Sequence, residues 1–280
     1  MMSRRFLADK IWLSLAFVAV VIAVIPLASI LYEVTRLGIS SMNIDFFTKL
    51  PPTLLPGSVG GMGNAVEGSL MLVALASLIG LPIGLLSGVF ISEYGNNWYG
   101  STVRFLGDVL VGNPSIVIGI LGYILLVIPF HGFSLVAGGV ALGVMTIPIV
   151  SNTTAEALKL VPNSLREASH ALGIRKWRTS ILILANAKSA VATGALLAIA
   201  RVMGETAPLI LTAGISTLWY SGPFQPVASL TYYIYYFSTS FPSHSAEFDL
   251  AWGAAFILIV IVMGINLGVR IITRGKTGHA

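Results

Sequence analysis

Residues 66–91 read VEGSLMLVALASLIGLPIGLLSGVFI, and Glu67 is the only charged residue among them. An α-helix needs roughly 20 apolar residues to cross about 30 Å of hydrocarbon, so this stretch is long enough to span a bilayer. The rest of the chain has the same character, because 56% of its 280 residues are hydrophobic and only 10% are charged. Soluble domains carry about 25% charged residues, so the sequence belongs among membrane proteins.

On both sides of this stretch, other apolar runs have a similar length. They predict an all-α polytopic membrane protein with six transmembrane helices, at 11–32, 66–91, 108–130, 134–154, 185–213 and 250–272. Most of the 16 Lys and Arg residues fall in segments that would share one side with the N-terminus. The positive-inside rule therefore predicts a cell-membrane protein with both ends in the cytoplasm. The net charge of +5 is thus read as a topology signal and not as a nucleic-acid surface.

The spans divide the chain into unequal parts. Residues 1–33 are expected to hold a cytoplasmic tail and the first helix, and residues 34–63, rich in Gly and Pro, an irregular external connector. Five spans follow within 64–273, which favours a five-helix core with the first helix as an accessory, although six equivalent helices also fit. That core contains a cytoplasmic loop at 155–180 and an aromatic external segment at 214–250, which we expect to lie at the membrane boundary or to meet an external partner. Residues 274–280 are expected to form a cytoplasmic tail.

The loop at 155–180 carries the signals of a short helix. Ser164 and Glu167 have the spacing of a capping box, and Gly173 stands where a left-handed terminator is expected, which predicts a helix over 165–172. Its narrow apolar stripe suits either a groove on a partner protein or the lipid headgroup layer. The residues predicted to dock such a partner are Leu165, Arg166, Glu167, Ala168, Leu172 and Gly173.

Two charged residues interrupt the fifth apolar run. Arg201 and Glu205 are four positions apart, so on a continuous helix they would share a face and pair. Pro208 has no N–H for the Gly204 carbonyl, which predicts a helix break over 204–208. A guanidinium matches the oxygens of a tetrahedral anion. We therefore predict an anion pathway through Arg201, Glu205 and Thr206, in which Glu205 holds Arg201 until the anion competes for it; a structural ion pair is the alternative.

Residues 167–173 read EASHALG, and Ile183 follows. This pattern resembles the EAA loop of ABC-importer permeases, in which the loop forms a coupling helix that docks into a cleft on an ATPase subunit. Two positions depart from the family pattern. Ser169 replaces an alanine, and Ala185-Asn186 stands where the family has Leu-Pro.

Residues 200–209 read ARVMGETAPL and resemble the signature of phosphate-importer permeases of the PstA type. The strings NAVEG at 64–68, ISEY at 91–94 and NPSIVIG at 113–119 are also similar to that family. The resemblance implies a type I ABC-importer permease fold, MetI-like, that moves inorganic phosphate by alternating access. It further implies a sister permease, two cytoplasmic ATPase subunits and an extracytoplasmic phosphate-binding protein.

Several alternatives remain open on the sequence. A permease for sulfate or molybdate would share the loop motif, and a passive anion channel would share the apolar spans. An enzyme is disfavoured, because the four His residues are scattered without metal-ligand spacing and no cysteine is present. The chain has no Gly-x-x-x-x-Gly-Lys-Ser/Thr loop, so we expect no cofactor on it and place ATP and Mg on the ATPase partner.

Overall fold

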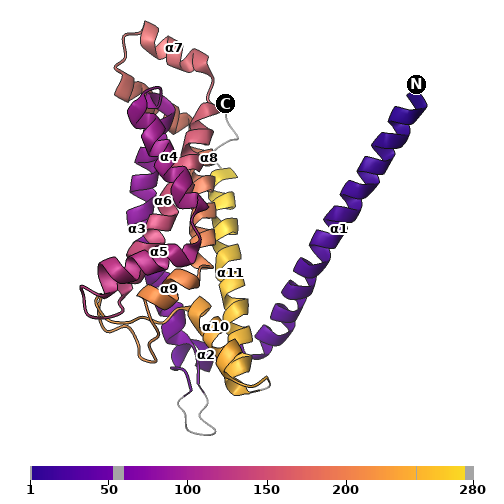
Figure 1. The fold of residues 1–280 in the computed structure, drawn as a ribbon, viewed down its shortest axis with the longest axis vertical. Helices are drawn as coiled ribbons and strands as arrows, with labels where there is room; N and C mark the ends of the chain where they lie inside the picture. Colours follow the sequence, from indigo (N-terminus) through magenta and orange to yellow (C-terminus); the bar gives the residue numbers. More distant parts are fainter. Residues whose placement is uncertain (1, 53–59, 244, 275–280) are drawn as a thin grey trace.

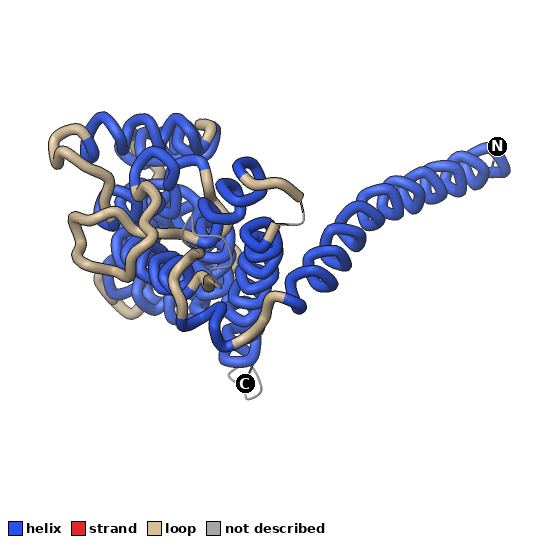
Figure 2. The backbone as a smooth tube through the Cα atoms, turned by 90° about the horizontal axis from the view of Figure 1, so that it is seen from below, coloured by secondary structure: helices blue, strands red, loops and turns tan. Residues whose placement is uncertain are grey.

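The computed structural model describes residues 2–52, 60–243 and 245–274, and no strand occurs in these ranges (Figures 1 and 2). The long helices are α1 (Met2–Ser40), α3 (Gly63–Tyr94), α6 (Leu135–Lys159), α8 (Lys176–Met203) and α11 (Ala246–Arg274). The short ones are α2 (Ile44–Thr48), α4 (Trp98–Gly112), α5 (Ser115–Gly122), α7 (Asn163–Ala171), α9 (Ala207–Thr212), α10 (Leu230–Ser240) and the π-helical η1 (Tyr123–Val127). Figure 1 places α7 at one end of the bundle and α2 with α10 at the other, and these are named the α7 end and the α10 end below.

The five long helices are each long and apolar enough to cross a membrane, and a bent pair of helices raises the number to six within the described residues. The predicted spans 11–32, 66–91 and 250–272 lie inside α1, α3 and α11, and 134–154 begins one residue before α6, at its N-cap Ser134. The loop predicted at 155–180 is shorter, because α6 continues to Lys159 and α8 begins at Lys176.

The predicted span 108–130 was wrong as a single straight helix. The chain instead forms α4 and then α5 with η1, and the two parts are bent by 102°. The bend falls at Asn113 and Pro114, where Asn113 is extended (φ −77°, ψ 136°). A residue before proline avoids the helical region, and proline itself offers no N–H to continue the ladder. The family-like string NPSIVIG therefore marks a corner.

The closest helix pair is α3 against α6, along a row of glycines on α3. Gly80, Gly84 and Gly88 are four residues apart and so lie on one face. A Cβ atom on Gly84 would lie 2.7 Å from the Val150 Cβ and 2.8 Å from the Ile147 carbonyl oxygen. Small residues spaced in this way let two membrane helices approach closely, so α3 and α6 form the tightly packed centre of the bundle.

α1 stands apart from the bundle (Figure 2), and none of its most apolar 18-residue window is buried. It meets the rest of the chain near its last turns, where Gly38 packs against Trp252 and Phe256 of α11. This arrangement agrees with the accessory position that the sequence predicts for the first helix. α1 is longer than expected, however, because it continues to Ser40.

The segment 34–63 is more ordered than the predicted irregular connector. It holds the end of α1 and the short helix α2, whose N-cap Asn43 accepts a hydrogen bond from the Phe46 amide at 2.8 Å. Phe46 is fully buried against Tyr233 and Phe237 of α10. Part of the aromatic segment 214–250 thus belongs to the core, and not to the membrane boundary alone. Residues 53–59 of the connector and 275–280 of the tail lie outside the described residues.

Candidate functional site

The predicted helix break is present at the end of α8. Gly204 closes α8 as its C-cap, and its amide donates to the Arg201 carbonyl at 3.1 Å. The Glu205 amide donates to the Val202 carbonyl, also at 3.1 Å, so the last turn is tighter than an α-helix. Thr206 is the N-cap of α9, and Pro208 sits in the first turn of α9, where a missing N–H does no harm.

The predicted ion pair between Arg201 and Glu205 was wrong. Among the described residues neither side chain forms an ion pair, and Arg201 is exposed while Glu205 is half-buried. The reason is the break itself. Glu205 lies beyond the C-cap of α8, so the rule that places residues four apart on one helix face does not apply. Within the described ranges, the Arg201 guanidinium therefore has no side-chain partner that would have to leave before an anion could bind.

The backbone around the break is held from two sides. The Thr231 hydroxyl at the start of α10 donates to the Glu205 carbonyl at 3.0 Å. On the other side, a Cβ atom on Gly119 of α5 would lie 2.8 Å from the Pro208 Cα, so α5 packs directly on α9. The two short helices and α10 thus fix the position of the break.

Exposed positions of α8 follow one helical face toward Arg201. Arg201 lies about 38 Å along the helix from Lys176, at 1.5 Å per residue. Polar groups on this face would be costly against lipid, so the pattern indicates a neighbouring protein or water. The exposed residues on this face are Asn186, Ala190, Thr193, Leu197, Arg201 and Gly204.

The helix predicted in the 155–180 loop is α7, and its C-terminus ends as expected. Gly173 has a φ of +69°. Its amide donates to the His170 carbonyl at 2.9 Å, and the Ile174 amide donates to the Ser169 carbonyl at 3.0 Å. This pair of bonds is a Schellman motif. The backbone of the turn is thereby closed, and Gly173 remains exposed.

The predicted N-terminus of this helix was wrong. Pro162 is the N-cap, so α7 begins at Asn163, and no side chain caps it. Pro162 (φ −55°, ψ 139°) turns the chain into the helix, and Ser164 is already inside the first turn. The Ser164–Glu167 spacing of a capping box is therefore not used.

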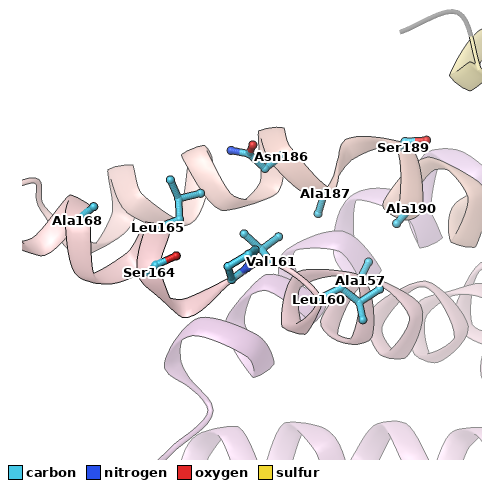
Figure 3. Close-up of a pocket in the computed structure, with 11 residues that line it drawn as sticks. Ala157, Leu160, Val161, Ser164, Leu165, Ala168, Asn186, Ala187, Ser189 and Ala190 are labelled. Carbon is cyan, nitrogen blue, oxygen red and sulfur yellow. The ribbon is translucent and has the colours of Figure 1, made fainter. Parts of the chain in front are cut away.

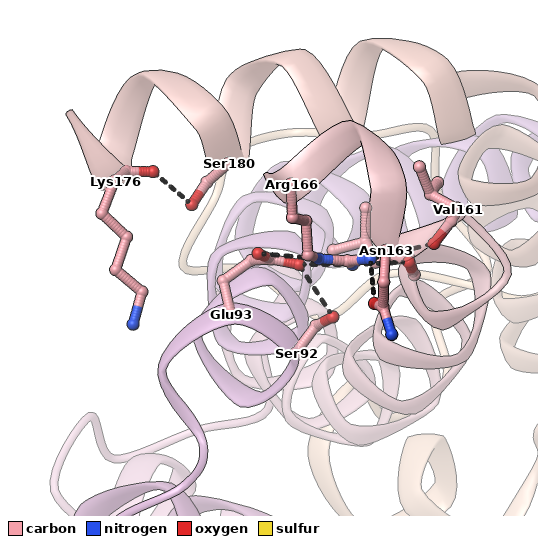
Figure 4. A network of polar contacts seen from close by, with 8 residues as sticks. Ser92, Glu93, Val161, Asn163, Arg166, Lys176 and Ser180 are labelled. Carbon is pink, nitrogen blue, oxygen red and sulfur yellow. Dashed lines mark hydrogen bonds and ion pairs between the residues drawn. The ribbon is translucent and has the colours of Figure 1, made fainter. Parts of the chain in front are cut away.

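Only part of the predicted docking set faces outward. Arg166 points inward, toward Glu93 at the end of α3 (Figure 4). Leu165 is half-buried and packs against the core at the end of α6, and it lines a groove of about 910 Å³ between α7 and α8 (Figure 3). The residues of the set that remain exposed are Glu167, Ala168, Leu172 and Gly173. The sequence did not identify Glu93, although an acid at the end of the apolar run 66–91 is a signal for it.

The described residues contain no group of three His, Asp or Glu side chains that could hold a metal ion. The chemical resources of the site are a free guanidinium, a nearby carboxylate and the polar backbone of a broken helix. Together they can bind and release an anion, and they offer no nucleophile with a base beside it.

Comparisons with known proteins show what this chain is similar to. Residues 80–275 match the model of a family described as "Binding-protein-dependent transport system inner membrane component". The chain is 38% identical over 272 residues to a "Phosphate transport system permease protein PstA" of Yersinia pestis, covering 96% of this chain and 90% of that protein. It is 39% identical to a protein of the same name from Haemophilus influenzae, covering 96% and 94%. The fold is similar to a chain of the inward-facing MetNI methionine ABC transporter, with a TM-score of 0.64, 20% identity and coverage of 77% of this chain and 97% of that chain.

Proposed function

This chain belongs to the family of binding-protein-dependent transport system inner membrane components, and we propose that it is the permease subunit of an ATP-driven importer of inorganic phosphate. It is a multi-pass membrane protein that serves transport. The two relatives named as phosphate permeases match it over almost its whole length, which favours phosphate over sulfate or molybdate as the cargo.

The observation that carries the proposal is the unpaired guanidinium of Arg201 beside the break at Gly204. Non-helical backbone at membrane depth is tolerated where it is packed in protein or lines a water-filled cavity. A charged donor there can replace part of the water around a passing oxyanion, because guanidinium presents a planar fork to two oxygens. Arg201 therefore provides a transient anion site at the point where the wall of the passage is broken.

Glu205 gives a reason for phosphate in particular. Its carboxylate is half-buried and, within the described residues, without an ion pair. Inorganic phosphate keeps at least one proton at neutral pH, because its third pKa lies far above neutral, and that proton can be donated in a hydrogen bond to a carboxylate, which only accepts. A fully ionised sulfate has no such donor and is only repelled. In place of the predicted role of holding Arg201, Glu205 selects for a protonated oxyanion.

The motor and the partners are supplied by other chains. The exposed residues of α7 dock an ATPase subunit, which binds ATP and Mg, while a sister permease completes the passage as a heterodimer with two such ATPases. The α7 end then faces the cytoplasm with both chain termini, and an extracytoplasmic phosphate-binding protein delivers the anion at the α10 end. Closing of the ATPases switches the passage between outward-open and inward-open states.

The test is uptake by the complete complex in proteoliposomes. Arg201→Ala should lower phosphate uptake by about 10- to 150-fold, because a hydrogen bond to a charged group is worth about 1.5–3 kcal/mol. Arg201→Lys, which keeps the charge and loses the fork, should retain part of the rate.

Uptake by the wild-type complex is measured separately for phosphate, sulfate and molybdate, with and without ATP. Uptake without ATP would indicate a passive channel. Uptake of sulfate or molybdate that is faster than that of phosphate would identify the faster anion as the cargo. Normal phosphate uptake by Arg201→Ala would contradict the assigned role of the guanidinium.

A further inference from the structure

Arg166 of α7 is bound by a complete set of acceptors at the α7 end (Figure 4). Its Nη2 donates to the Glu93 Oε1 at 2.8 Å and to the Leu158 carbonyl at 2.9 Å. Its Nη1 donates to the Val161 carbonyl at 2.9 Å and to the Asn163 Oδ1 at 3.2 Å, and Nε donates to the Glu93 Oε2 at 3.4 Å. The bidentate contact fixes the angle between α7 and α3 as well as their distance.

The pair is shielded from solvent, unlike the other ion pairs of the described residues. The Glu93 side chain is 6% exposed and that of Arg166 20%. In the pair of Arg36 with Glu33, the two side chains are 57% and 40% exposed. Exposed pairs contribute little, whereas losing one partner of a buried pair leaves a charge without compensation. Removing either partner of the contact between α3 and α7 is therefore expected to be costly.

Tyr94, the residue after Glu93 in α3, contacts the start of α8, on the other side of the loop that joins α7 to α8. The ammonium of Lys176, the first residue of α8, lies 4.5 Å from the centre of the Tyr94 ring. This distance permits a cation–π interaction. Glu93 and Tyr94 thus contact the helix before Gly173 and the helix after it, and the exposed docking face lies between these two contacts.

The far end of α3 is tied to the α10 end of the molecule. The Asn64 side chain donates to the Ser216 carbonyl at 2.8 Å, and the Ser69 hydroxyl accepts from the Leu230 amide at 2.8 Å. Both partners belong to the segment that follows the break in α8 and begins α10. Since α3 is 32 residues long, it joins the two ends over about 48 Å.

We propose that Glu93, assisted by Tyr94, is a positioning residue that transmits the movement of α7 to α3 and through it to the α10 end. This proposal rests on the proposed function, because it assigns Glu93 a part in coupling ATP hydrolysis to transport. A structural role alone would make assembly, hydrolysis and uptake fall together when the contact is lost. With a transmitting role, loss of the contact lowers phosphate uptake more than ATP hydrolysis, because the ATPases continue to hydrolyse ATP while α3 no longer moves with α7.

The experiment measures phosphate moved per ATP hydrolysed by the complete complex in proteoliposomes. Glu93→Gln keeps the size and one acceptor and removes the charge. We expect this ratio to fall about 5-fold or more, the lower end of typical coupling between sites. Glu93→Asp should restore part of it, and Glu33→Gln, which removes the exposed pair with Arg36, should leave it unchanged.

A ratio equal to wild type in Glu93→Gln, or a parallel loss of hydrolysis and uptake, would overturn the proposal. A wild-type complex that hydrolyses ATP and moves no phosphate would instead refute the proposed function.

A second variant does not depend on the stability of Glu93→Gln. The chain has no cysteine, so Glu93→Cys with Arg166→Cys introduces a single thiol pair. The ratio should be low with free thiols and should return when a short bifunctional thiol reagent joins them, because a covalent tether replaces the ion pair. A cross-linked complex no better coupled than the uncrosslinked one would show that α7 and α3 need not move together.

Discussion

Replacing Gly173 tests whether the turn after α7 acts through its backbone. With φ at +69°, an L-residue carrying a Cβ is strained there by about 1–2 kcal/mol. A Cβ atom on Gly173 would meet no atom within 4 Å, so steric clash adds nothing inside this chain. If docking of the ATPase requires this turn, 1–2 kcal/mol weakens the complex by about 5- to 30-fold. We therefore expect Gly173→Ala to bind the ATPase this much more weakly, and Gly173→Val to bind it more weakly still.

The assay is equilibrium binding of the purified ATPase to the permease in lipid nanodiscs. Gly173→Asn is the decisive variant, because asparagine tolerates the left-handed conformation and should lose only a small part of the affinity. Gly112→Ala is the matched control, since Gly112 also faces open space and has no positive φ. If Gly173→Asn binds as poorly as Gly173→Val, the ATPase contacts the glycine directly, and the backbone explanation is refuted.

Two other changes test the anion site and the packing of the bundle. Glu205→Gln should reduce the preference for phosphate over sulfate, measured as competition for labelled phosphate on the complex without its binding protein; an unchanged preference would exclude Glu205 as the selecting group. Gly84→Ala should destabilise the protein by about 1–3 kcal/mol, because the new Cβ atom would lie 2.7 Å from the Val150 Cβ. Thermal unfolding in detergent checks this, with Gly264→Ala, whose Cβ atom would meet nothing within 4 Å, as the control; equal melting temperatures for the two variants would contradict it.

Apolar run length was sufficient to predict the straight helices, because a bilayer imposes the same requirement on every span. α3 and α6 are accordingly close to their predicted ranges. Length could not reveal the 102° corner at Asn113 and Pro114, since apolar residues continue on both sides of it. The proline was the available signal, and reading it as a tolerated kink, as for Pro82 inside α3, would miss the corner.

At the site, local backbone signals were more reliable than side-chain pairing. Gly173 and the break at Gly204 are where the sequence predicts them, because a terminating glycine and a helix-breaking proline act on their own few residues. The partner of Arg166 is 73 positions away, and no local pattern relates it to Glu93. The expected pair of Arg201 with Glu205 failed for a related reason, since it assumed that the helix continued through its own predicted break.

The separation of α1 from the bundle bears on how the chain is made. A ribosome delivers α1 to the membrane first, yet its contact at Gly38 is with Trp252 and Phe256, residues synthesised more than 200 positions later. A helix in lipid already satisfies its backbone hydrogen bonds, so α1 can stay folded in the bilayer before the later helices are made. The packing of α1 at Gly38 can form only after α11 has been made, so a chain that stops before α11 lacks this contact between its first helix and the bundle.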